Sequence, residues 1–335
     1  MRMPGILMLA AILLVTGLAE PRSVQAVEPI DFHPMATAGP VALLSYNVEG
    51  LPWPLTHGRT AAAAAIAENL RERHARDGGP QVVAVQEAFG DAQKAIGLAA
   101  GYRYAAFGPT ADLPAASATT PAQHAFLADA SLWHGETETP REDSGLAIFS
   151  DYPILWVRRM AYPRFACAGY DCLANKGVLA VALRVPGQRQ PLIVVDTHLN
   201  ARAASGVAAG RSLTAYRWQA DRLASFLNTI GTGGAPMVLA GDFNVGNDPA
   251  RQQYLSQALL GASGMTLAGS ETTCGSGCRT VAPVPTFICA KTILSYRGTG
   301  RSIAPLGSTG TFGITSDGRH LSDHVGVIRR FDLDS

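Results

Sequence analysis

The sequence carries little charge and no excess of either sign. Lys and Arg total 27, Asp and Glu total 26, and charged residues make up 16% of the chain. With no basic excess, the overall composition does not attract nucleic acid or other polyanions, so any basic surface would have to be local. A hydrophobic content of 47% excludes a disordered chain. We find neither an internal repeat nor a dividing linker, which predicts one globular domain.

Residues 1–26 have the three parts of a secretory signal peptide. Arg2 precedes an apolar stretch over 6–19, and Val24, Gln25 and Ala26 form a small-residue cleavage pattern. The apolar stretch is short for a membrane span, so an uncleaved anchor is the less favoured alternative. We therefore predict cleavage after Ala26 and a secreted or periplasmic protein with a single catalytic domain over 27–335. Loss of two arginines and one glutamate leaves that domain with a formal charge of 0.

Cysteine is scarce, with five residues: Cys167, Cys172, Cys274, Cys278 and Cys289. In an exported protein the short spacings 167/172 and 274/278 favour disulfides, which leaves Cys289 over. A four-thiolate zinc site is the alternative, but these spacings fit it poorly and an oxidising compartment disfavours it.

Six apolar runs predict buried strands and two stretches predict helices. The strand candidates are 41–47, 81–87, 144–150, 177–185, 191–200 and 236–244. The helix candidates, 60–77 and 212–230, are each followed by glycine, which favours a helix end. Strands separated by helices, together with strands that follow strands directly, predict an α/β fold with mixed sheets. The stretches 108–143 and 261–286 predict long loops.

Polar residues follow several of these runs where each run ends. GDFN at 241–244 sets Asp242 and Asn244 two positions apart, on one face of the sheet if the strand continues. Other polar residues in comparable places are Asn47, Glu87, His198 with Asn200, and Asp323 with His324 ahead of a further apolar run. Turns, caps and helix-dipole contacts explain each one separately. Their repetition predicts a site at the strand ends, where α/β proteins gather ligand groups.

In order along the chain, six motifs resemble the endonuclease/exonuclease/phosphatase superfamily of metal-dependent phosphoesterases. They are SYNVEG at 45–50, VQEAF at 85–89, SGLAIFSDYPI at 144–154, DTHLN at 196–200, GDFN at 241–244 and LSDH at 321–324. The resemblance implies a two-sheet α/β sandwich, the four-layer DNase I-like fold, with the site at one edge of the sheets. Residues 175–201, in which Lys176 and Gly177 open a strand, are most similar to the secreted neutral sphingomyelinase-like branch.

The resemblance implies Mg²⁺-dependent attack of water on a phosphate ester, and the residue types suit that chemistry. Glu87 and Asn47 supply hard oxygen ligands for Mg²⁺, and Asp323 joins directly or through a water. Mn²⁺ and Ca²⁺ are alternative ions. Lys176 and Asn200 are the predicted substrate-binding residues.

Four further residues are predicted to be catalytic. We expect Asp242 to orient or deprotonate the attacking water, and Asn244 to fix the water or donate to the phosphate. His324 would assist the water, and His198 would stabilise the transition state or protonate the leaving oxygen. Exchanged roles for Asp242 and His324 fit the sequence equally well.

One carboxylate of the superfamily pattern is missing. An aspartate on a strand ahead of the SDH motif usually orients the final histidine, but the corresponding stretch here, PTFICAKTILSY at 285–296, has no acidic residue. Asp317 or a backbone carbonyl is the candidate replacement. A non-catalytic binding module that keeps the fold is therefore one alternative.

The leading interpretation is a secreted phosphodiesterase that cleaves a phospholipid head group at a membrane surface, with sphingomyelin as the best single substrate. Trp53, Phe126 and Trp133 are candidates for bilayer contact, although ordinary core packing is the favoured interpretation of these aromatics. A secreted endonuclease is disfavoured for want of a basic face. Such a face would have to assemble locally from Arg158, Arg159, Arg202 and Arg211. An inositol-phosphate phosphatase is a further alternative, and no protein partner is predicted.

Overall fold

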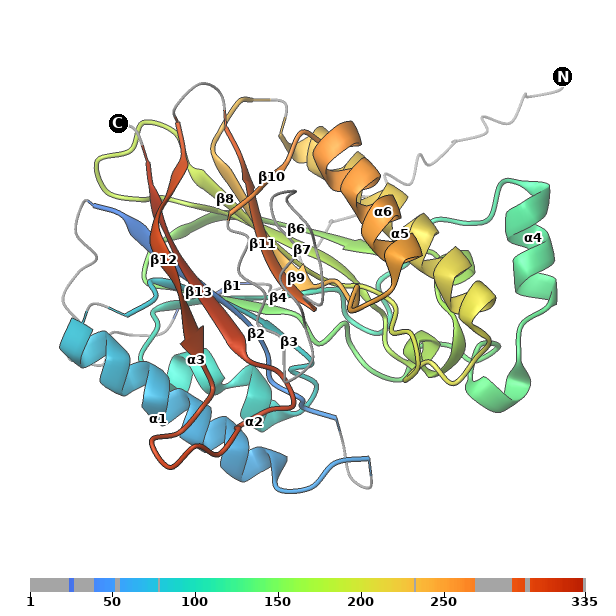
Figure 1. Cartoon of the computed structure of the whole chain (residues 1–335), viewed down its shortest axis with the longest axis horizontal. Coiled ribbons are helices and arrows are strands. Elements are labelled where there is room, and N and C mark those ends of the chain that lie inside the picture. The colour runs from blue at the N-terminus through green and yellow to red at the C-terminus, as the bar shows by residue number, and fades with distance from the viewer. Residues whose placement is uncertain are drawn as a thin grey trace, which may run out of the picture.

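Two β-sheets pack face to face, with helices on both outer faces, so the molecule has four layers (Figure 1). The computed structural model describes residues 24–26, 39–51, 55–77, 79–231, 233–268, 291–298 and 302–333. The predicted two-sheet α/β sandwich is confirmed.

The first sheet has seven strands in the order β1-β4-β5-β3-β2-β13-β12. Their bounds are β1 (Val24–Ala26), β2 (Val41–Asn47), β3 (Val82–Gln86), β4 (Tyr104–Phe107), β5 (Ala147–Ser150), β12 (Ala304–Phe312) and β13 (Gly326–Asp332). Only β2 and β3 pair in parallel among these described strands. The helix α1 (Arg59–Asp77) forms the crossover that a parallel pair requires.

The second sheet repeats this plan with six strands in the order β10-β11-β9-β8-β7-β6. Their bounds are β6 (Ile154–Ala161), β7 (Gly177–Leu183), β8 (Leu192–His198), β9 (Met237–Asp242), β10 (Thr266–Leu267) and β11 (Thr292–Arg297). The central strands β8 and β9 pair in parallel through the crossover helix α5 (Ala209–Ile230). Each sheet therefore has one parallel pair whose carboxyl ends lie together.

The remaining helices are short. They are α2 (Asp91–Lys94), α3 (Ile96–Ala99), α4 (Pro121–Ala128), α6 (Pro249–Ser256), the 3₁₀ turns η1 (Leu132–His134), η2 (Arg164–Ala166) and η3 (Gly169–Leu173), and the π turn η4 (Gln257–Ala262). None of the described helices is long and apolar enough to span a membrane.

Three apolar layers hold the sandwich together. One lies between the sheets and includes Val41, Val194 and Phe331. A second packs α1 and α3 onto the first sheet, and the third packs α5 and α6 onto the second sheet. In the strands β2, β3, β7, β8 and β9 every residue is buried, which explains their continuous apolar sequences.

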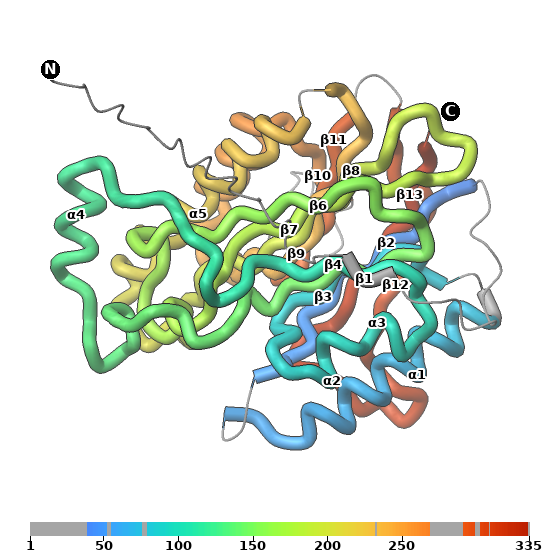
Figure 2. The backbone as a smooth tube through the Cα atoms, turned by 180° about the vertical axis from the view of Figure 1, so that it is seen from behind, coloured from blue at the N-terminus to red at the C-terminus, as the bar shows by residue number. Residues whose placement is uncertain are grey.

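The stretch 108–143 differs from the predicted loop, because it contains α4 and η1. Thr120 caps α4: its side chain accepts from the Gln123 backbone N–H, the Gln123 side chain accepts from the Thr120 N–H, and Pro121 fills the first turn. α4 stands out from the sandwich, close to α5 (Figure 2). Most of the other predicted loop, 261–286, lies outside the described residues.

The last three residues of the predicted signal peptide form β1, which pairs with β4 in antiparallel register. Cleavage after Ala26 would remove β1 and leave β4 at the edge of the first sheet. The processing site stays a prediction.

Candidate active site

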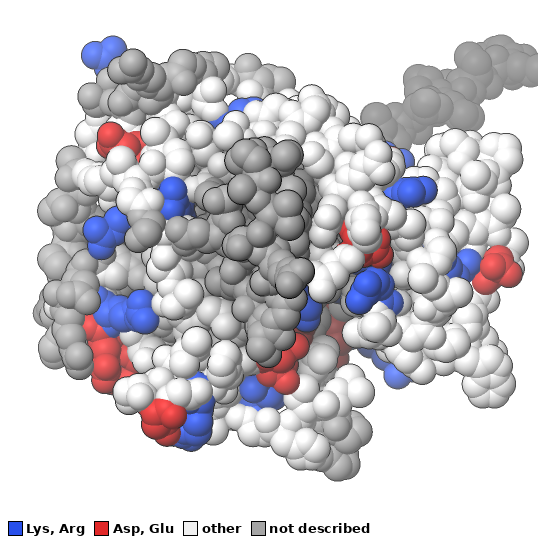
Figure 3. All heavy atoms as spheres, in the orientation of Figure 1, with Lys and Arg blue, Asp and Glu red and all other residues white. Residues whose placement is uncertain are grey.

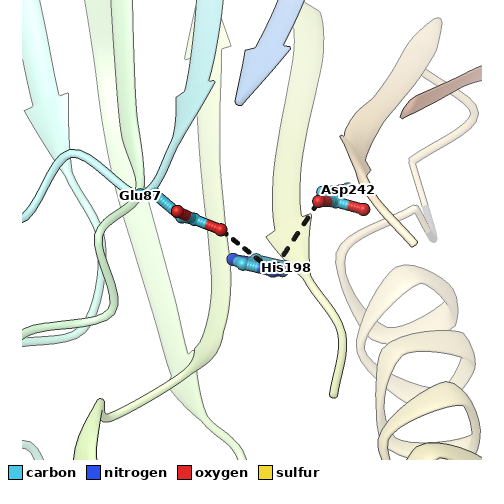
Figure 4. A group of neighbouring side chains, drawn as sticks. All are labelled: Glu87, His198 and Asp242. Carbon is cyan, nitrogen blue, oxygen red and sulfur yellow. Dashed lines mark ion pairs between the residues drawn. The ribbon is translucent and has the colours of Figure 1, made fainter. Parts of the chain in front are cut away.

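The carboxyl ends of the two parallel pairs bring four predicted site residues together. Asn47 ends β2 and Glu87 follows β3 in the first sheet, while His198 ends β8 and Asp242 ends β9 in the second. Figure 4 shows Glu87, His198 and Asp242 pointing toward one another from these strand ends. These four side chains therefore lie together where the two sheets meet, and their role as a site stays a prediction.

A single amide links the carboxylates of the two sheets. The Asn47 Nδ2 donates to Glu87 Oε1 at 2.8 Å and to Asp242 Oδ2 at 3.0 Å. The Asn47 oxygen accepts from the backbone N–H of Glu49 at 2.9 Å. In this arrangement Asn47 turns its N–H groups, rather than its oxygen, toward the carboxylates.

The backbone at Glu87 and Asn244 is left-handed, with φ of 58° and 47°. Such angles cost a non-glycine residue about 1–3 kcal/mol and cluster at functional sites. Gly50 permits the bend at Glu87, since a Cβ at that position would lie 2.1 Å from the Glu87 carbonyl oxygen. The chain turns at Asn244, which is the alternative to a continuing strand: β9 ends at Asp242, whose Oδ1 accepts from the Asn244 N–H at 3.0 Å.

Glu87, His198 and Asp242 can hold a metal ion. One ligand atom from each of these residues lies within 4.8 Å of the others. His198 Nε2 is 4.0 Å from Glu87 Oε1 and 3.8 Å from Asp242 Oδ2. One buried and one partly buried carboxylate at this range favour a divalent cation, and their hard oxygens suit Mg²⁺. The group can thus hold a divalent cation, and Mg²⁺ as the ion stays a prediction.

Burial and neighbouring charges separate the pKa values of these groups. Burial raises the pKa of Glu87, with a further contribution from the Asp242 charge. Burial would also raise the pKa of Asp242, but His324, His198 and Asn47 outweigh it and lower the value to about 2. Burial and the adjacent Lys176 lower the pKa of His198 to about 3. At neutral pH Asp242 is therefore ionised and His198 is neutral.

Two donors converge on His198 and fix its tautomer. Its Nε2 lies 3.3 Å from Lys176 Nζ and 3.1 Å from Asn244 Nδ2. Because an ammonium and an amide NH₂ can only donate, Nε2 is the acceptor and the ring proton is on Nδ1. Lys176 and Asn244 thus contact the site through His198, on the side of the second sheet.

His324 reaches Asp242 from the segment ahead of β13. Its Nε2 lies 3.5 Å from Asp242 Oδ2 and 3.8 Å from Asp323 Oδ1. Ser322 fixes the segment, since its hydroxyl accepts from the His324 N–H and donates to the Asn47 carbonyl. Asp323 is largely exposed, and its backbone N–H donates to Glu49 Oε2 at 2.9 Å. Its predicted role as a metal ligand stays a prediction.

The missing carboxylate is not replaced by Asp317. That side chain accepts from Thr315 and from Arg319 Nε in its own exposed turn. The strand β11 sets Thr292 opposite Asp242, and residues 292–297 contain no acidic side chain. Within the described part of the chain, Asp242 and Asp323 are the carboxylates that lie next to the His324 ring.

Asn200 lies near the site, but it is fully buried and both polar atoms of its side chain are hydrogen-bonded to the backbone. Its Oδ1 accepts from the Ala168 N–H and its Nδ2 donates to the Ala201 carbonyl. These contacts describe a structural role, so substrate binding by Asn200 remains a prediction without support from the geometry.

Sequence reasoning missed three supporting residues. Arg251 is fully buried and donates to the carbonyls of Asn200 and Asn244, which ties the segments after β8 and β9 together. Ser322 anchors His324, and Asp171 pairs with Lys176. The predicted Cys167–Cys172 disulfide is confirmed. The other three cysteines lie outside the described residues.

Comparison of the sequence with known protein families gives one match. The model of the endonuclease/exonuclease/phosphatase family matches residues 44–324. No curated protein matches the sequence.

Several solved structures share the fold at low sequence identity. Sphingomyelinase C from Streptomyces griseocarneus is 22% identical, with a TM-score of 0.55 over 87% of this chain and 99% of that one. A mutant of Staphylococcus aureus beta toxin with bound magnesium ions is 15% identical, with a TM-score of 0.59 over 87% of this chain and 99% of that one. D. rerio TDP2, complexed with a single-strand DNA product, is 17% identical, with a TM-score of 0.54 over 88% and 99%.

Proposed function

The chain belongs to the endonuclease/exonuclease/phosphatase family, and on this premise we propose that it is a secreted Mg²⁺-dependent phosphodiesterase that cleaves phospholipid head groups, sphingomyelin foremost. The observation that carries the proposal is the meeting of Glu87, His198 and Asp242 at the joint edge of the two sheets. A bound Mg²⁺, held by Glu87 and Asp242, would neutralise phosphate charge and polarise the ester. Asp323 is a further candidate ligand, as is Asn47 once its amide is reversed so that the oxygen faces the ion.

His324 is the group proposed to accept a proton from the attacking water. Its Nε2 lies 3.5 Å from the Asp242 carboxylate, which is ionised and can stabilise the imidazolium that forms. Asp242 would also orient the water, because its Oδ2 already accepts from Asn47 at 3.0 Å and is held in place.

We assign His198 to stabilisation of the transition state rather than to protonation of the leaving oxygen. The lowered pKa leaves the ring neutral, and its Nε2 already accepts from Lys176 and Asn244. The ring therefore holds the Lys176 ammonium and the Asn244 amide beside the carboxylates. There, the positive charge of the ammonium and the amide dipole would stabilise the negative charge that develops on the phosphoryl oxygens.

An exposed apolar pair supports a lipid substrate. Trp133 is 87% exposed and its neighbour Leu132 is 65% exposed, both on η1. Phe126, by contrast, packs against Trp218 and the Arg211 guanidinium, while Trp53 lies outside the described residues. Tryptophan favours the interface between water and a bilayer. The sphingomyelinase C and beta toxin structures are consistent with this substrate class.

The endonuclease alternative is disfavoured by the charge distribution. Positive and negative groups are interspersed on the face seen in Figure 3. Arg159 donates to the Phe107 carbonyl and Arg211 pairs with Glu136, so two of the four candidate arginines are engaged within the protein. The likeness to TDP2 keeps nucleic acid in the assay as the competing substrate.

The deciding experiment measures phosphocholine release from sphingomyelin vesicles by the mature protein, with Mg²⁺ and with EDTA, alongside plasmid nicking. We expect Mg²⁺-dependent lipid cleavage that falls about 10³-fold or more in Asp242→Ala. Asp317→Ala removes an exposed aspartate outside the site and is the matched control. Plasmid nicking without lipid cleavage would overturn the proposed substrate. No turnover of sphingomyelin, plasmid DNA or a nitrophenyl phosphodiester would favour the non-catalytic binding module.

A further inference from the structure

We propose that Arg251 is a positioning residue of the site: its guanidinium holds the left-handed turn at Asn244 and so keeps the Asn244 amide against His198. The kinetic consequence of this inference rests on the proposed function, and its structural consequence does not. Arg251 acts through Asn244 rather than on the substrate.

The guanidinium of Arg251 joins the two segments that follow β8 and β9. Its Nη1 donates to the Asn200 carbonyl at 2.6 Å and to the Asn244 carbonyl at 3.0 Å, and its Nη2 donates to the Ala201 carbonyl at 3.2 Å. The Asn200 carbonyl lies just beyond the end of β8, and the Asn244 carbonyl lies just beyond the end of β9. One side chain therefore fixes the two segments relative to each other.

The turn at Asn244 depends on such support. Its φ of 47° is unfavourable for a residue with a side chain, and a conformation of this kind persists only where its surroundings hold it. Asp242 Oδ1 accepts from its backbone N–H, the Leu199 carbonyl accepts from its Nδ2, and Arg251 binds its carbonyl. Loss of the Arg251 bond would free this peptide group to rotate, which would move Nδ2 away from His198 Nε2, now 3.1 Å distant.

Arg251 is itself held from both α5 and α6. It is fully buried in the first turn of α6, where Asp248 Oδ1 accepts from its backbone N–H at 3.2 Å. On the side of α5, the guanidinium Cζ lies 4.4 Å from the centre of the Tyr216 ring, and Nη2 lies 3.4 Å from the Ser212 hydroxyl. The planar guanidinium directs separate N–H groups at several acceptors, whereas lysine offers one compact nitrogen. We therefore expect that lysine cannot replace Arg251, although it keeps the charge.

The first test needs no activity. Amide hydrogen exchange is measured by NMR in the metal-free protein, for wild type and for Arg251→Lys. We expect exchange of the Asn244 N–H to accelerate at least about tenfold more than that of the Leu223 N–H in the middle of α5, because the turn opens locally. Equal acceleration at the two amides would indicate only a general loss of stability and would overturn the inference.

The second test compares the kinetics of Arg251→Lys, Asn244→Ala and their combination. We expect Arg251→Lys to lower kcat about 10–100-fold with KM within about twofold, as for other groups that orient site residues. The combination should lose no more than Asn244→Ala alone, because Arg251 acts through that amide, and multiplying losses would contradict the inference. Arg217→Lys is the matched control, since Arg217 is an exposed arginine on α5 that lies over the Tyr254 ring of α6.

If Arg251→Lys fails to fold, wild type alone decides the question. Exchange of the Asn244 N–H and of the Leu255 N–H in α6 should respond equally to low concentrations of urea, since Arg251 fastens the turn to α6. An Asn244 N–H that exchanges independently of α6 would refute the inference. If wild type cleaves no phosphodiester, the proposed function fails while the exchange rates still decide this inference.

Discussion

At the scale of single residues, Glu136 shows how one buried carboxylate organises the region beside the site. Its Oε1 accepts from Arg211 Nε at 2.7 Å and from the Gly169 N–H at 2.8 Å, and its Oε2 accepts from the Ser131 N–H. It therefore joins η1, η3 and α5 through one side chain. Burial would raise its pKa, but these partners outweigh burial and lower the pKa below the ordinary value.

The sign of that shift predicts acid sensitivity. A carboxyl group with a lowered folded-state pKa stabilises the fold fully above its unfolded-state pKa, and the contribution is lost as pH falls through the folded-state value. We expect the thermal unfolding temperature of wild type to fall between pH 6 and pH 3 more steeply than that of Glu136→Gln. Equal slopes for the two proteins would contradict the prediction. Glu138→Gln, at a more exposed site nearby, serves as the control.

The convergence of strand-end polar residues was the part of the candidate site that the sequence could predict. Asn47, Glu87, His198 and Asp242 follow apolar strands, so their place was visible in the pattern. The contribution of Asp171 was not visible, because an aspartate between two cysteines gives no sign that its carboxylate pairs with Lys176. Whether the chain continues as a strand to Asn244 or turns there was left open by the sequence, since a strand pattern does not show where the strand stops, and the positive φ of Asn244 shows a turn.

At the scale of elements, η1 exposes apolar side chains to solvent, and hydrogen bonds hold the backbone on both sides of it. The Arg164 guanidinium donates to the carbonyls of Glu136 and Glu138, just after η1, and Glu136 fixes Ser131 before it. The His134 ring stacks against Tyr170, which is itself 50% exposed. Leu132, Trp133 and Tyr170 therefore stay exposed in a defined arrangement.

We predict that Trp133→Ala weakens binding to phosphatidylcholine–sphingomyelin vesicles about tenfold, measured by co-sedimentation in EDTA so that no substrate is cleaved. Burial of a large apolar side chain is worth roughly 1.5–3 kcal/mol, and about 1.4 kcal/mol corresponds to a factor of ten. Cleavage of a soluble nitrophenyl phosphodiester should be unchanged. Leu155→Ala alters an exposed leucine on the edge strand β6 and should bind like wild type. Equal binding by the two variants would exclude η1 as the contact.

The elements themselves were largely predictable where burial is complete. The helices α1 and α5 and the central strands follow the predicted ranges within a few residues, because their apolar pattern and their glycine stops are local. α4 was missed although its Thr-Pro-Ala-Gln start is a capping signal, since its sequence lacks a regular apolar stripe. The irregular pairing of β12 with β13 depends on contacts that no local pattern encodes.

At the scale of the whole molecule, a bound cation would connect the two sheets. We predict that saturating Mg²⁺ raises the unfolding temperature of wild type by several degrees, because a ligand at 100 times its Kd stabilises the fold by about 2.7 kcal/mol. Glu87→Gln should show little or no rise, whereas Glu68→Gln, an exposed residue on α1, should respond like wild type. A full response in Glu87→Gln would place the cation elsewhere.

The hydrogen bond from Asn47 to Asp242 joins residues 195 positions apart in the chain. Contacts of such long sequence separation form slowly and late during folding. A refolding chain would thus regain its helical circular dichroism well before any enzymatic turnover. The rate at which activity returns during refolding therefore reports the rate at which the two sheets dock. The same docking step determines when a newly made molecule first becomes competent for turnover.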